Sequence, residues 1–231
     1  MIIHGISDLH RQHLTLTRYL TGGDLLLIGG DYDCKIEEEL FNFLRWCIKV
    51  AKNYTLGVVM TCGNHDALFA EYEDDIREFI KDTKVQLLLN QELTLSNGFT
   101  IFGSPNSESL GQIHENAYVG KVQELDQVYK NIPAGLDLLL THTPPKGVMD
   151  NYCGSIALEN QIAKKNPRLH MFGHAHESHG YLQLEKYPNT HFFNMNVVGT
   201  VNQGPWMPVV VEYDMNTRTL VSYTILEIDV T

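Results

Sequence analysis

The chain has 231 residues, of which 43% are hydrophobic and 19% are charged, so it can bury a sizeable core and is not a disordered chain. Its formal net charge of -11 argues against the basic surface needed to bind a nucleic-acid polymer or an anionic membrane. The first residues show no signal-peptide pattern, and the four cysteines form no Cys-x-x-Cys pair, so we expect a cytoplasmic protein with one domain over residues 1–231.

The first part of the chain alternates short apolar strands with amphipathic helices. Strands are expected over 2–7, 25–28 and 56–60, and helices over 36–51 and 67–80. Each of these strands ends at a turn that carries polar residues.

The pattern then changes to shorter strands. They are expected over 85–89, 93–95 and 99–102, with a hairpin turn at Asn97-Gly98 before the last. The polar segment 104–120 predicts a long loop, and loops of this length are often functional. The remaining expected elements are helices over 121–130 and 155–165 and strands over 136–140, 169–172, 209–211 and 220–228. This order predicts an α/β fold with two packed sheets.

Five polar clusters each follow a short apolar strand. They are Asp8-Leu9-His10, Gly30-Asp31, Gly63-Asn64-His65-Asp66, Thr141-His142-Thr143-Pro144-Pro145 and Gly173-His174-Ala175-His176. We expect them to meet, because ligand sites gather at the carboxyl ends of strands in open α/β sheets. Residues i and i+2 of an extended segment point the same way, so Asp8 and His10 can face one ion, and His174 and His176 likewise. Carboxylate and imidazole ligands suit Mn, Fe, Zn, Co or Ni, among which we favour Mn.

Taken in chain order, the patterns D-x-H, G-D, G-N-H-D, T-H-x-P-P and G-H-x-H resemble the calcineurin-like metallophosphoesterase superfamily over residues 8–176. The segments LTHTPPKGVMD and FGHAHESHGY look most like its branch of metallophosphoesterase-domain (MPPED, UPF0046-type) proteins. Several members of that branch are similar to class III cyclic nucleotide phosphodiesterases. The resemblance implies a four-layer α/β/β/α sandwich with two mixed sheets flanked by helices.

The resemblance also implies a role for each residue of the clusters. Asp8, His10 and His176 would hold a first metal ion, Asn64, His142 and His174 a second, and Asp31 would bridge both. A water activated by the two divalent ions would attack the phosphoester, and the catalytic His65 would protonate the leaving oxygen.

One position departs from the superfamily pattern. Many members pair the histidine that matches His65 with an acid three residues after the bridging aspartate, and that position is Cys34 here. Asp33 is the nearest acid and is a candidate to orient His65, although another group could take this part.

Residues next to the motifs are candidates for substrate binding. Arg11 can bind a phosphate in a fork. The other candidates are His13, Asn106 in the segment Ser104-Pro105-Asn106, and His114 in the long polar loop. For each of them a structural role is the alternative, and Asn194 and Asn196 are expected to support the C-terminal sheet.

Three functions remain open. The leading one is hydrolysis of a small phosphodiester, with a cyclic nucleotide as one candidate substrate. A phosphomonoesterase or protein phosphatase is the second, although residues 30–34 and 63–66 depart from the G-D-x-x-D-R-G and G-N-H-E motifs of serine/threonine phosphatases. A non-catalytic metal-binding scaffold is the third, and the complete set of ligand residues argues against it. The oligomeric state is not readable from the sequence.

Overall fold

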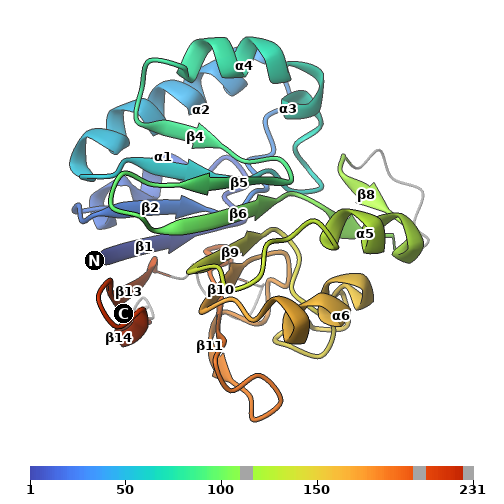
Figure 1. Cartoon of the computed structure of the whole chain (residues 1–231). Coiled ribbons are helices and arrows are strands. Elements are labelled where there is room, and N and C mark those ends of the chain that lie inside the picture. Colours follow the sequence, from blue (N-terminus) through green and yellow to red (C-terminus); the bar gives the residue numbers. More distant parts are fainter. Residues whose placement is uncertain (110–116, 200–206, 226–231) are drawn as a thin grey trace.

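Two six-stranded mixed sheets pack face to face, and helices cover the outer face of each (Figure 1). The computed structural model describes residues 1–109, 117–199 and 207–225. The arrangement confirms the expected α/β class with two packed mixed sheets flanked by helices. Within the described part of the chain, no helix is long and apolar enough to cross a membrane.

The first sheet has the strand order β14-β13-β1-β2-β3-β4. Its parallel strands are β1 (Ile2–Ile6), β2 (Leu25–Ile28), β3 (Val58–Met60) and β4 (Val85–Leu87), and the antiparallel edge consists of β13 (Val209–Asp214) and β14 (Thr219–Thr224). Its helices are α1 (His13–Leu16), α2 (Glu37–Val50), α3 (Ala67–Glu71) and α4 (Glu73–Ile80), with 3-10 turns at Thr17–Tyr19 and Ala51–Asn53.

The second sheet has the strand order β11-β12-β10-β9-β6-β5. Its strands are β5 (Gln91–Thr94), β6 (Thr100–Ser104), β9 (Leu138–Thr141), β10 (Leu169–Phe172), β11 (Gly180–Gln183) and β12 (His191–Asn194). Its helices are α5 (Val122–Tyr129) and α6 (Ile156–Lys165), and the loop before α5 carries the short pair β7 (Ser107–Glu108) and β8 (Val119–Gly120).

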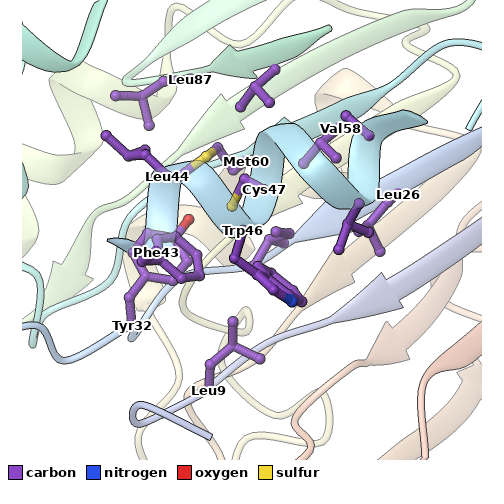
Figure 2. Close-up of a cluster of buried hydrophobic side chains, with 14 of the residues drawn as sticks. Leu9, Leu26, Tyr32, Phe43, Leu44, Trp46, Cys47, Val58, Met60 and Leu87 are labelled. Atoms are coloured by element: carbon purple, nitrogen blue, oxygen red, sulfur yellow. The ribbon is translucent and has the colours of Figure 1, made fainter. Parts of the chain in front are cut away.

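Alternation along the buried strands builds the layers. In β2, Leu26 and Ile28 pack against the helices of the first sheet, whereas Leu25 and Leu27 pack against the second sheet. Figure 2 shows Leu26 in the helix-facing layer together with α2 side chains such as Trp46. Full burial of such a side chain stabilises the fold by roughly 1.5–3 kcal/mol. The near-continuous apolar runs predicted as strands are therefore buried on both faces.

Two expected elements differ from the observed ones. The single helix expected over 67–80 is wrong: it breaks at Tyr72, where ψ is 24°. Acidic residues at 73–75 then occupy the first turn of α4, where they stabilise a new helix start. The strand expected over 220–228 is observed as β14, which ends at Thr224, and its residues 226–228 lie outside the described residues.

Candidate metal centre

The polar clusters lie where strands of both sheets end. β1, β2 and β3 run parallel to one another, and so do β9 and β10. Two contacts join the sheets at these ends: Nδ1 of His142 lies 2.9 Å from the carbonyl oxygen of Gly29, and Ser7 forms a parallel bridge with Asn196. Sheet packing therefore brings the clusters together at one edge of the sandwich.

Asp8, His10, Asp31 and His176 form a first candidate group, in which one donor atom from each lies within 4.8 Å of the others. Nε2 of His176 lies 3.3 Å from Oδ1 of Asp8 and 3.4 Å from Nε2 of His10. Nε2 of His10 is in turn 3.9 Å from Oδ2 of Asp31. Two carboxylates and two imidazoles thus converge on one small volume, which is a donor set for a first-row divalent metal ion.

Asp31, His142 and His174 form a second candidate group with the same 4.8 Å limit. Nε2 of His142 lies 3.4 Å from Oδ2 of Asp31 and 3.1 Å from Oδ1 of Asn64, so the Asn64 amide oxygen extends this group. A carbonyl oxygen can only accept a hydrogen bond, so Nδ1 of His142 carries the proton donated to Gly29. With Nδ1 occupied in this way, Nε2 is the ring atom of His142 that can bind a cation once its own proton is displaced.

Asp31 belongs to both groups, and the division between them is the one that the superfamily resemblance implies. The expectation that His174 and His176 face one ion is wrong, because they lie in different groups. The physical reason is the backbone at His174, where φ is 68°. The segment is not extended there, so the alternation of side chains does not apply.

The charges of the site favour metal binding. Burial alone would raise the pKa of Asp31, but the adjacent His142 outweighs this effect and lowers it. The Asp31 carboxylate likewise outweighs burial at His142 and raises the pKa of that imidazole to about 9. Burial and the charge of His142 lower the pKa of His174 to about 4. At neutral pH the carboxylate is therefore ionised and His174 keeps a free lone pair, whereas His142 holds a proton on Nε2 that a bound cation would displace.

Two glycines let the backbone approach the ligands. A Cβ atom at Gly63 would lie 2.3 Å from Oδ1 of Asp31, and one at Gly173 would lie 2.1 Å from Oδ2 of Asp8. Any side chain there would displace a carboxylate. The oxygen and nitrogen donors and these close approaches fit two divalent cations, one held by each group.

Asp66 is a functional residue that the sequence interpretation missed. Its buried carboxylate accepts hydrogen bonds from the backbone N–H groups of Asp31, Tyr32, Asp33 and Gly63, at 2.8, 2.8, 3.1 and 2.8 Å. Burial and the charge of Asp31 raise the pKa of Asp66 to about 7, while the N–H donors favour its ionised form. Its place in the G-N-H-D motif was the available signal, but three of its four partners lie more than thirty residues away in the sequence.

Asn194 and Asn196 support the metal centre as well as the C-terminal sheet. Both side chains are fully buried. Nδ2 of Asn194 donates to the carbonyl oxygen of Ala175 at 2.9 Å, and Nδ2 of Asn196 donates to that of His176 at 2.7 Å. They hold the segment that carries His174 and His176.

His65 stands at the opening of the site, with 45% of its side chain exposed. Its backbone N–H donates to Oδ1 of Asp31 at 2.9 Å, and its ring lies edge to face with that of His10. Nδ1 of His65 is 3.9 Å from Oδ1 of Asp33, which also pairs with Lys35. The other oxygen of Asp33 is 3.9 Å from Nδ1 of His10. Asp33 therefore lies between the two histidines.

The candidate substrate residues lie outside the two ligand groups. Nη1 of Arg11 is 3.5 Å from Oε1 of Glu39 at the start of α2. The ring of His13 packs against Phe43 and Trp46 of the same helix, and burial lowers its pKa.

The Asn106 side chain accepts a hydrogen bond from Oγ of Ser104 at 3.2 Å and contacts the carbonyl oxygen of Tyr118. His114 lies outside the described residues. Substrate binding by these residues stays a prediction.

Comparison with known proteins gives concordant matches. The sequence profile of a family described as calcineurin-like phosphoesterase matches residues 1–178. UPF0046 protein K07C11.7 of Caenorhabditis elegans is 30% identical over an alignment of 224 residues, which covers 89% of this chain and 72% of that protein. Metallophosphoesterase domain-containing protein 1 of Homo sapiens is 29% identical, over 89% of this chain and 68% of that protein. The crystal structure of TT1561 of Thermus thermophilus shares the fold, with a TM-score of 0.67, 16% identity and coverage of 97% and 98% of the two chains.

Proposed function

Since the chain belongs to the calcineurin-like phosphoesterase family, we propose that it hydrolyses a small phosphodiester with the help of two divalent metal ions. Family membership and the ligand groups together support a metal-dependent phosphoester hydrolase. The observation that carries the proposal is the convergence of two ligand groups that share the Asp31 carboxylate. The preference for a diester, with a cyclic nucleotide as one candidate, rests on the resemblance to the phosphodiesterase-like branch.

The residues around the site have distinct tasks in this reaction. Asp8, His10 and His176 would hold one ion and Asn64, His142 and His174 the other, with Asp31 between them. Ions bound there would activate water and offset the charge of the phosphate oxygens. These tasks need the ligands to be fixed before substrate arrives.

His65 is the proposed proton donor to the leaving oxygen. Its exposed ring can reach a substrate at the opening, while its backbone N–H holds Asp31. We propose that Asp33 orients the ring through Nδ1, which leaves Nε2 to carry the proton that is transferred. Lys35 pairs with the same carboxylate and would help to hold it in place.

The proposed setting follows from charge and thiol chemistry. The mixture of carboxylate, amide and imidazole donors accommodates Mn, the ion that we favour among Mn, Fe, Zn, Co and Ni. The net charge of -11 supports a small substrate rather than a nucleic-acid polymer. All four cysteines are free thiols in the structure, which supports a reducing, cytoplasmic location.

The test is an activity screen on protein reconstituted with Mn²⁺. We expect cleavage of bis-p-nitrophenyl phosphate or a cyclic nucleotide, and a loss of at least about a hundredfold in Asp31→Asn, because this carboxylate anchors both ligand groups. Asp82→Asn, at an exposed position after α4, is the matched control and should keep full activity. If the protein cleaves p-nitrophenyl phosphate but no diester, the proposal changes from a phosphodiesterase to a phosphomonoesterase. If it cleaves no ester, the result favours a non-catalytic metal-binding scaffold.

A further inference from the structure

The segment between His142 and α6 carries an exposed tyrosine, and the residue before it is hydrogen-bonded to Glu177, which follows the ligand His176. Tyr152 is 86% exposed, more than any other large hydrophobic or aromatic side chain among the described residues. It follows the Thr-His-x-Pro-Pro motif, to which no role beyond His142 has been given. We propose that Tyr152 is a specificity-determining residue that stacks on an aromatic ring of the phosphoester substrate.

Two hydrogen bonds hold this segment, one across its base and one to the segment that carries His176. At its base, the backbone N–H of Ser155 donates to the carbonyl oxygen of Pro144 at 2.9 Å. At its tip, Nδ2 of Asn151 donates to Oε2 of Glu177 at 2.7 Å. Glu177 directly follows the ligand His176. Tyr152 therefore extends from a turn that is fastened beside the first ligand group.

The turn itself is held in one conformation. Asp150 accepts hydrogen bonds from the backbone N–H of Cys153 at 2.7 Å and, through its carboxylate, from that of Gly154 at 3.3 Å. Nζ of Lys146 lies 3.4 Å from the same carboxylate and donates to the carbonyl oxygen of Tyr152. A fixed turn presents its side chain with little loss of freedom on binding.

Backbone conformation and electrostatics point to the same position. Met149, Asn151 and Tyr152 have φ values of 48°, 36° and 66°, which are unusual for side chains of this size. Strained residues of this kind persist where surrounding contacts impose them, and they cluster at ligand-binding sites. The thiol of the next residue, Cys153, has its pKa raised to about 12 by burial, by Asp150 and, to a smaller extent, by Asp8.

The chemistry of the ring defines what it would bind. A phosphate fixed at the ligand groups leaves its organic part at the opening, where a tyrosine face offers apolar, uncharged contact. Aromatic rings stack on such a face regardless of their substituents, and a nucleobase and an aryl group both satisfy it. The inference deepens the proposed function and rests on phosphate binding at that centre.

The experiment measures dissociation constants of Mn²⁺-loaded full-length protein by calorimetry. Adenosine 5′-monophosphate is compared with ribose 5-phosphate, and phenyl phosphate with methyl phosphate, so that each pair differs by one ring. We expect wild type and Tyr152→Phe to prefer the ring-bearing partner about tenfold, which corresponds to about 1.4 kcal/mol. Tyr152→Ala and Tyr152→Leu should lose that preference and bind the ring-free ligands unchanged.

The outcomes separate the inference from the function. A loss with adenosine 5′-monophosphate alone assigns a nucleobase, and a loss with both pairs assigns any aromatic group. No ring preference in wild type, a preference that survives in Tyr152→Ala, or equal weakening of all four ligands overturns the inference. If the protein shows ring-dependent binding but hydrolyses no ester, the proposed hydrolase activity is contradicted, whereas the proposed role of Tyr152 in ligand binding is retained.

Discussion

The substitution Asp66→Asn tests whether the loops of the metal centre depend on one buried carboxylate. Each oxygen of Asp66 accepts two backbone N–H groups, Oδ2 from Asp31 and Gly63 and Oδ1 from Tyr32 and Asp33. In asparagine an NH₂ group replaces one of the two oxygens. This group cannot accept hydrogen bonds from the two backbone N–H groups that face it. Two charge-assisted hydrogen bonds are lost, which costs about 3–5 kcal/mol. At roughly 2–4 °C per kcal/mol for a chain of this size, Tm should fall by about 6–20 °C.

Thermal unfolding followed by circular dichroism, with a chelator present, measures this effect without a contribution from bound metal. Calorimetric titration with Mn²⁺ should show affinity weakened about 10- to 100-fold, because Asp66 holds the loop of Asp31. Asp82→Asn serves as control, and its exposed carboxylate should change stability by less than about 0.5 kcal/mol. An Asp66→Asn protein with the Tm and the metal affinity of wild type would refute the reasoning.

Three further outcomes follow from the structure. Gly173→Ala should abolish Mn²⁺ binding in a calorimetric titration, because its Cβ would lie 2.1 Å from Oδ2 of Asp8; retained affinity would contradict this. Burial lowers the pKa of His170 to about 3. Between pH 6.5 and pH 3 the unfolded chain therefore binds a proton at this residue that the folded protein does not bind. Stability present above pH 6.5 should therefore be lost toward pH 3 by up to about 1.4 kcal/mol per pH unit, and urea unfolding at several pH values should show a shallower loss in His170→Gln. Asp137→Ala should destabilise the fold by about 2–4 kcal/mol in urea unfolding, since it removes the buried acceptor of the Tyr213 hydroxyl and the Thr100 N–H; a change below about 1 kcal/mol would count against this.

Much of the fold was predictable because its signals are local. A buried parallel strand is a short apolar run, and the run at Leu25–Ile28 begins and ends as expected. Polar residues after such runs must lie at strand ends, which placed Asp31 and His142 near each other without knowledge of the sheet order. The break at Tyr72 was not predictable in this way, because the helical spacing of apolar residues continues across it.

The supports of the site were less predictable than its ligands. Asp66 binds backbone atoms more than thirty residues away in the sequence, and Asn196 binds a carbonyl oxygen twenty residues away. Every residue except proline has a backbone N–H group, and every residue has a carbonyl group. A sequence pattern therefore cannot predict which backbone group a buried side chain will bind. The position of Tyr152 likewise depends on the contact between Asn151 and Glu177, two residues that lie 26 positions apart in the sequence.

Backbone conformation explains why the ligand set needs these supports. Asp8, His10, Asp31 and His174 have φ values of 57°, 37°, 54° and 68°, although a residue with a side chain usually avoids this region. Each such conformation costs on the order of 1–3 kcal/mol and persists when surrounding contacts impose it. The Asp66 carboxylate imposes it at Asp31, and the backbone N–H of His174 donates to both oxygens of Asp8 at 3.0 Å. Alternation along an extended strand could not have separated His174 from His176, because the chain leaves the extended conformation at His174.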